Sequence, residues 1–227
     1  MQKIKVWDAP TRIFHWLLVA AVLALFVTGK VGGNAIEWHG RIGHFVLGLI
    51  VFRLVWGFVG STYARFAQFW PTPARIRAYL RGEWRGQGHN PLGALSVFAL
   101  LGLVGLQAGI GLFTNDDIAF RGPLYPLVGA ELSSRLTGLH HLLADVLMGF
   151  VLLHIGAILF YAHVKKDNLI KPMFTGWKEA EAGEPAQGDS LAGLILALGV
   201  AVLALWLAAG SWLPAPPPPA ALETPAW

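Results

Sequence analysis

Residues 137–163 read TGLHHLLADVLMGFVLLHIGAILFYAH. A helix of 27 residues is about 40 Å long at about 1.5 Å per residue, which exceeds the roughly 30 Å of hydrocarbon in a bilayer. The stretch holds one acidic residue, Asp145, and no lysine or arginine. It therefore predicts a membrane-spanning helix that carries several histidines.

Four further apolar blocks indicate that the whole chain is built for a membrane. The 227 residues are 55% hydrophobic and 13% charged, with a mean hydropathy of +0.55, which excludes an ordinary water-soluble domain. The blocks long enough to cross a bilayer lie at about 12–29, 39–60, 92–113, 137–163 and 191–213. We therefore predict an all-α integral membrane protein in contact with membrane lipid. The absence of cysteine excludes disulfides, iron–sulfur ligation and covalently attached c-type haem.

Lysine and arginine are distributed unequally between the connections. Twelve lie in the N-terminal arm, in 61–90 and in 164–189, whereas four lie in the connections on the other side. Because cytoplasmic connections are enriched in these residues, we expect a bacterial inner-membrane protein with a cytoplasmic N-terminus and, after five spans, a periplasmic C-terminus. The net charge of +4 is thus a sign of topology rather than of nucleic-acid binding.

The spacing of His140 and His154 points to a bound cofactor. Fourteen residues at about 100° per residue bring two side chains to within about 40° of one face, roughly 21 Å apart along the axis. One imidazole then lies near each membrane surface. A single histidine in a span is more often hydrogen-bonded to a neighbouring helix, but this repeat favours two ligands on one face. His141 points about 140° away from His154 and is the weaker candidate.

Haem b requires two axial imidazoles on opposite faces, so two haems need one more histidine at each depth. His39 opens the second apolar block on the outer side, and His15 lies near the cytoplasmic start of the first. The pairs that agree in depth are His39 with His140 at the outer haem and His15 with His154 at the inner haem. The predicted unit is a four-helix bundle that carries two haem b groups, with a fifth helix added.

His44 competes with His39 for the outer haem, because both lie near the start of the second block although they point about 140° apart. Arg53 favours His39. It follows His39 by fourteen residues on the same face, near the cytoplasmic end, where a buried guanidinium can pair with a propionate of the inner haem. Alternatively, Arg53 reaches past the helix end to lipid headgroups. His39 is preferred, and His44 is kept as the alternative.

The remaining polar candidates are the pair His141 and Asp145, which allows two interpretations, and two further histidines. His141 precedes Asp145 by four residues, so the two share a face and form either a proton or quinone site or a buried hydrogen bond. His89 and His163 fall in or beside polar connections and are expected at the surface. No residue is assigned a catalytic role.

Composition divides the chain into a bundle and an appended helix. Residues 1–176 form the predicted di-haem bundle, in which the basic segment 74–85 is expected to lie on the lipid surface. Residues 177–189 are charged and weakly apolar, which predicts a flexible cytoplasmic linker. The helix within 190–213 is expected to pack outside the bundle or to anchor a partner, without binding a cofactor. The Pro-rich tail 214–227 should be extended.

Several segments together resemble the bacterial cytochrome b561 family and the related b-type cytochrome subunits of nickel–iron hydrogenases. The similar segments are 7–16 (WDAPTRIFHW), 38–44 (WHGRIGH) with 52–57 (FRLVWG), 139–142 (LHHL) continuing to His154, and 166–169 (KDNL). The resemblance covers about residues 5–176. It implies a four-helix bundle with two haems ligated at His15, His39, His140 and His154, which exchanges electrons with quinone and a redox partner.

Three functions remain open at this point. The first is electron transfer through two haems between the quinone pool of a respiratory chain and a redox partner, expected to be a periplasmic c-type cytochrome. In the second, the chain is the haem b anchor subunit of a hydrogenase or another soluble oxidoreductase. The third is a haem-free proton or metal transporter that uses the histidines. If the chain itself turns over a substrate, quinol oxidation is the expected half-reaction.

Overall fold

The computed structural model describes residues 2–118, 120–180, 183–188 and 190–214. Its long helices are α1 (Ala9–Val31), α2 (Ala35–Val59), α5 (Pro91–Gly111), α6 (Gly129–His163) and α8 (Leu191–Ala208). The short elements are β1 (Gln2–Lys5), η1 (Thr62–Ala64), α3 (Phe66–Phe69), α4 (Pro73–Leu80), η2 (Tyr125–Leu127), α7 (Ile170–Thr175) and β2 (Trp177–Ala180). Within the described ranges, five helices are long and apolar enough to cross a membrane, which confirms the predicted fold class.

Side-chain caps explain where three of the long helices begin. Asp8 accepts a hydrogen bond from the Thr11 N–H at 2.6 Å, Asn90 accepts one from the Gly93 N–H at 2.7 Å, and Ser190 caps α8 in the same way. Asp8 is also the buried centre of a small network, since its carboxylate accepts from the Trp56 indole N–H at 3.1 Å and from the hydroxyl of Ser61. The start of α1 is thereby fixed to the end of α2.

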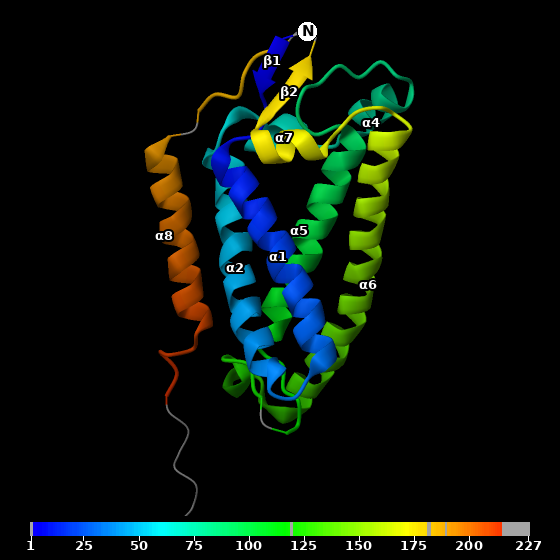
Figure 1. Ribbon diagram of the computed structural model, residues 1–227. Coiled ribbons are helices and arrows are strands. Elements are labelled where there is room, and N and C mark those ends of the chain that lie inside the picture. Colours follow the sequence, from blue (N-terminus) through cyan, green and yellow to red (C-terminus); the bar gives the residue numbers. More distant parts are fainter. Residues whose placement is uncertain (1, 119, 181–182, 189, 215–227) are drawn as a thin grey trace, which may run out of the picture.

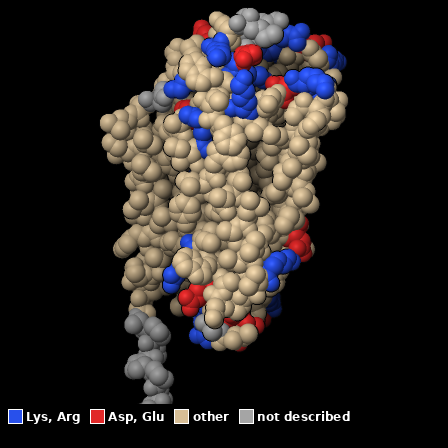
Figure 2. All heavy atoms as spheres, in the orientation of Figure 1, with Lys and Arg blue, Asp and Glu red and all other residues tan. Residues whose placement is uncertain are grey.

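The four helices of the bundle pack in the order α1, α2, α5 and α6 (Figure 1). Helix α2 is central, and its large side chains Val46 and Trp56 are each only 1% exposed. Many apolar side chains instead face outward, such as Phe58 at 74% and Leu153 at 68% exposed. Lysine and arginine gather at the end that carries β1 and β2, and the band below is almost free of charge on the visible face (Figure 2). This is the surface expected of a protein solvated by lipid.

The end of the bundle with β1, β2, α4 and α7 is called the sheet end below, and the opposite end the far end (Figure 1). Helix α6 begins at Gly129, eight residues before the predicted span, and therefore extends beyond the apolar stretch at the far end. Its added turns carry an exposed ion pair between Glu131 and Arg135 at 2.7 Å. Hydropathy marks only the part of a helix that lies in lipid, so such polar turns are missed.

Helix α8 packs on the outside of the bundle against α2, as predicted (Figure 1). Small residues make the close approach possible, because Ala197 is 0% and Ala201 7% exposed. On α2, a Cβ added at Gly48 would lie 2.9 Å from the side chain of Leu205. The fifth helix is thus fitted to α2 along most of its length.

The predicted flexible linker 177–189 is wrong for the residues that the structure describes. Residues 177–180 form β2, which pairs antiparallel with β1 from Gln2↔Ala180 to Lys5↔Trp177. Further along, the Ala186 N–H donates to the Lys5 carbonyl at 2.7 Å, and the Thr62 N–H donates to the Gln187 carbonyl at 2.8 Å. Polar composition suggested disorder, but these backbone bonds to distant segments order the connection. The Pro-rich tail lies outside the described residues from 215 onward.

Candidate functional site

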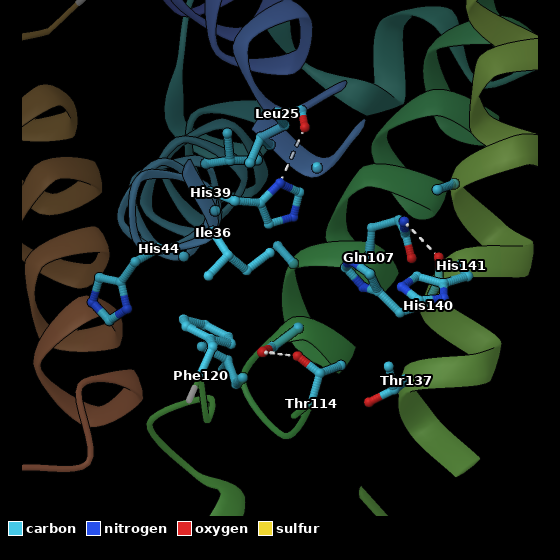
Figure 3. Close-up of a pocket in the computed structure, with 18 of the residues that line it drawn as sticks. Leu25, Ile36, His39, His44, Gln107, Thr114, Phe120, Thr137, His140 and His141 are labelled. Atoms are coloured by element: carbon cyan, nitrogen blue, oxygen red, sulfur yellow. Dashed lines mark hydrogen bonds between the residues drawn. The ribbon is translucent and has the colours of Figure 1, made fainter. Parts of the chain in front are cut away.

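At the far end of the bundle, His39 on α2 faces His140 on α6 (Figure 3). Their ring centroids are 6.0 Å apart, and the ring planes are 78° to each other. A metal–imidazole bond is about 2 Å long, and the ring centre lies about 1 Å beyond the nitrogen, so two imidazoles on one metal ion have centroids about 6 Å apart. The spacing of the two rings therefore fits a single metal centre between them.

Hydrogen bonds fix the orientation of His39. Its Nδ1 donates to the carbonyl of Leu25 on α1 at 3.0 Å (Figure 3). The hydroxyl of Thr28 is also 3.3 Å from this nitrogen. A protonated Nδ1 leaves the lone pair on Nε2, which is the form of imidazole that binds a metal. The backbone of α1 thus holds His39 in the tautomer that can bind a metal through Nε2.

The space around these two rings has the size of a cofactor site. A cavity of about 1400 Å³ lies between α1, α2, α5 and α6 at the far end, against roughly 300–1,000 Å³ for a typical small-molecule pocket. Two glycines leave the cavity open beside His39 and His140. A Cβ at Gly29 would lie 3.1 Å from Cε1 of His39, and one at Gly111 would lie 3.4 Å from Cε1 of His140. The residues present therefore fit a haem.

The alternative candidates at the far end are placed differently. The Nε2 of His44 donates to the Leu205 carbonyl of α8 at 3.0 Å, so this ring points away from His39 and toward the fifth helix (Figure 3). His141 borders the cavity beside His140, at a centroid distance of 6.5 Å. Asp145 also lines the cavity, and its side chain is exposed rather than buried in a hydrogen bond. The geometry favours His39 and His140.

His15 of α1 and His154 of α6 both lie toward the sheet end of the bundle. The Nδ1 of His154 is 3.3 Å from the hydroxyl of Ser96 on α5. The Nδ1 of His15 is buried and has no hydrogen-bond partner in the described part of the chain. The fourteen-residue repeat of α6 thus contributes one histidine to each end of the bundle.

Arg53 lies at the sheet end of α2 and is 3% exposed. Its Nη2 donates to the carbonyl of Ala64 at 3.1 Å, and its guanidinium carbon lies 4.8 Å from the ring centre of Phe66. Its Nη1 is buried without a partner among the described residues. Arg53 therefore does not reach out to lipid headgroups, and it has an unused donor in the protein interior.

Two polar residues of α5 were not singled out from the sequence. Ser96 contacts His154, and the side-chain amide of Gln107 donates to the backbone carbonyl of His140 at 3.0 Å. The signal was present, because these are polar side chains in an apolar span. They are eleven residues apart, which brings their side chains to within about 20° of the same face. His140 and His154, fourteen residues apart, likewise share a face of α6.

The two histidines expected at the surface have different outcomes. His163 is exposed, as predicted. The prediction is wrong for His89, whose ring lies between Trp7 and Phe69 with its Nδ1 buried. Its position is set by the N-cap Asn90 and by Pro91 at the start of α5, which hold the connection against the bundle. The polar composition of the connection before α5 predicted contact with solvent, whereas the ring of His89 packs against aromatic side chains.

The fold and the site define a class of protein: a helical membrane bundle with histidines near both ends, two of which, His39 and His140, face each other. Residues 6–176 match the sequence profile of the prokaryotic cytochrome b561 family. The chain belongs to this family. It is accordingly a b-type cytochrome, an integral membrane protein that transfers electrons by means of haem b.

Curated relatives extend over most of the chain. The probable Ni/Fe-hydrogenase B-type cytochrome subunit of Azotobacter vinelandii is 26% identical over 223 aligned positions, covering 80% of this chain and 91% of the relative. The corresponding proteins of Bradyrhizobium diazoefficiens (27% identical; 78% and 86% covered) and Escherichia coli K12 (25%; 79% and 92%) carry the same kind of name. No solved structure matches the chain.

Proposed function

We propose that the chain carries electrons across the membrane through two haem b groups. The outer haem is held between His39 and His140, and the inner haem between His15 and His154. The observation that carries this proposal is the 6.0 Å separation of the His39 and His140 rings across a cavity of about 1400 Å³. The fourteen-residue repeat on α6, which supplies His154 at the other depth, supports a second group.

The bound haems supply the reversible one-electron chemistry, and the protein sets the conditions for it. Leu25 keeps Nε2 of His39 free for ligation through the hydrogen bond to Nδ1. Glycines 29 and 111 leave the space that the flat cofactor and its ligands need. Arg53 contributes a positive charge at the sheet end, where it favours carboxylate groups of the inner cofactor.

The electron partners are proposed from the relatives and from charge distribution. We infer that the sheet end, where lysine and arginine gather, is cytoplasmic in a bacterial inner membrane. The names of the relatives favour a hydrogenase as the electron donor. We propose that the chain is the haem b anchor of such an enzyme, with quinone as the acceptor. Electron flow from quinol to a periplasmic c-type cytochrome is the second candidate, because Asp145 and His141 border the far-end cavity and are suited to a quinol hydroxyl.

A reduced-minus-oxidised spectrum of the purified protein tests the haem proposal. Soret and α bands with two haems per chain are the expected result. A spectrum without haem bands would reject it and return the haem-free transporter, and one haem per chain would reject the second site.

The partner is tested in membrane vesicles that contain the chain with and without the hydrogenase subunits of the same organism. Hydrogen should reduce the haems only when those subunits are present, and added quinone should reoxidise them. Reduction by quinol alone, followed by electron transfer to added cytochrome c, would instead support the second candidate.

A further inference from the structure

His89 occupies a protected position at the sheet end. Its ring centroid is 4.6 Å from that of Trp7 and 4.4 Å from that of Phe69. Its Nδ1 is buried and has no hydrogen-bond partner in the described part of the chain. Buried polar atoms in folded proteins are nearly always paired, so an unpaired one indicates that a group is missing from its side.

Another buried donor without a partner among the described residues is Nη1 of Arg53. A row of aromatic rings connects the two residues, since the Arg53 guanidinium lies over Phe66, whose ring centroid is 5.8 Å from that of Phe69. Phe69 in turn contacts His89. The elements α2, α3 and the connection before α5 thus bring a buried guanidinium and a half-buried imidazole, whose Nδ1 is buried, to one corner of the bundle.

This corner adjoins the inner pair of histidines. Burial first, and then the charges of Arg53, His15 and His154, lower the pKa of His89 to about 3. The ring is therefore neutral at pH 7 and offers one N–H, whereas Arg53 is charged. One neutral and one charged donor, both unpaired, are suited to a single carboxylate group.

We propose that His89 and Arg53 together bind a propionate carboxylate of the inner haem, with Nδ1–H of His89 and Nη1 of Arg53 as the donors. The inference rests on the proposed function, because it requires a haem between His15 and His154. It assigns a ligand-binding role to His89. Trp7 and Phe69 act as positioning residues that hold the imidazole in place.

The assignment has a measurable consequence for the inner haem. Reduction adds one negative charge, which is more favourable when a nearby carboxylate is neutralised by hydrogen bonds. Removal of the His89 donor should therefore lower the reduction potential of the inner haem. The outer haem lies at the other end of the bundle and should keep its potential.

The test uses the purified full-length holoprotein and the variants His89→Phe and His89→Gln. Phenylalanine keeps the ring between Trp7 and Phe69 but removes the N–H, whereas glutamine keeps a donor. We expect His89→Phe to lower the reduction equilibrium constant of the inner haem about tenfold, or about 59 mV for one electron. Its propionate bands in the resonance Raman spectrum should shift, and His89→Gln should restore more than half of both effects. The control is His163→Phe, because His163 is exposed.

An unchanged potential and unchanged propionate bands in His89→Phe would overturn the inference. An equal shift in both variants would also overturn it, since packing alone would then explain the effect. The outer haem of each sample reports folding, and His89→Leu, which also removes the donor, takes the place of His89→Phe if that variant does not assemble. Failure of the proposed function is separate, because it would appear in the unaltered protein as the absence of an inner haem.

Discussion

At the scale of single residues, the two histidines of α2 differ in the bonds that they make. His39 donates through Nδ1 to Leu25 and has Nε2 free, whereas His44 uses Nε2 for the carbonyl of Leu205. An imidazole already bonded through Nε2 to another helix has to give up that bond before it can ligate a metal through this nitrogen. The hydrogen-bond partners of the two rings therefore favour His39 over His44 as the proposed haem ligand.

The first prediction separates these roles. His39→Ala should lose the outer haem and keep the inner one, because only one of its two axial ligands would remain. His44→Ala should keep both haems and weaken only the contact with α8. Haem quantification and the α-band spectrum measure the result. Two haems in His39→Ala together with one in His44→Ala would transfer the ligand to His44.

The same measurement applies to the adjacent pair on α6. His140→Ala should lose the outer haem, whereas His141→Ala, the matched control, should keep it. The reason is that His140 faces His39 at 6.0 Å, and His141 lies beside it. Retention of both haems in His140→Ala would assign the ligand to His141.

At the scale of elements, the least expected feature is how firmly the fifth helix is fitted to the second. A Cβ at Gly193 would lie 3.4 Å from Cγ2 of Val59, and the small residues along α8 continue this contact. The family profile ends at residue 176, before α8 begins. Of the two helices in contact, α2 therefore lies within the segment that matches the family profile and α8 lies outside it.

Engineered cysteines test this contact, since the chain has no cysteine of its own. The pair Val59→Cys and Gly193→Cys should form a disulfide on mild oxidation, because the two positions are in van der Waals contact. The control pairs Val59→Cys with Leu203→Cys, whose side chain is 55% exposed. Mass spectrometry detects the bond within one chain. Equal cross-linking of both pairs would show that α8 is not held in this position.

At the scale of the whole molecule, charge distinguishes the two ends of the bundle. Lysine and arginine are concentrated at the sheet end, next to the proposed inner haem, and the far end has fewer of them (Figure 2). This asymmetry is the basis of the proposed orientation. It also determines which haem faces which compartment, and so which partner can reach it.

Topology reporters test the orientation. Alkaline phosphatase fused after residue 214 should be active, because this enzyme folds only in the periplasm, and a fusion within 82–88 should be inactive. The reverse pattern would place the sheet end in the periplasm and exchange the positions of the proposed partners. Fluorescent-protein fusions at the same two sites provide the complementary control.

The sequence by itself determined the class of fold and the candidate ligands. Apolar length fixes the spans, because a helix must cover the hydrocarbon, and helical periodicity puts His140 and His154 on one face. It preferred His39 to His44 only through the position of Arg53 on the same helix face, and it could not predict the hydrogen bonds of either ring. It also misjudged His89 and the connection 177–189, whose polar composition suggested contact with solvent.

The hydrogen bonds of these rings and the packing of the two misjudged segments come from the tertiary structure, because each depends on groups distant in the chain. Leu25 lies fourteen residues before the ring of His39 that it orients, and Leu205 lies 161 residues after His44. The ring of His89 packs against Trp7 and Phe69 with its Nδ1 buried, and β2 is ordered by pairing with β1, which lies near the N-terminus. Periodicity and hydropathy describe one helix at a time, whereas hydrogen bonding and burial depend on what the fold places beside each residue.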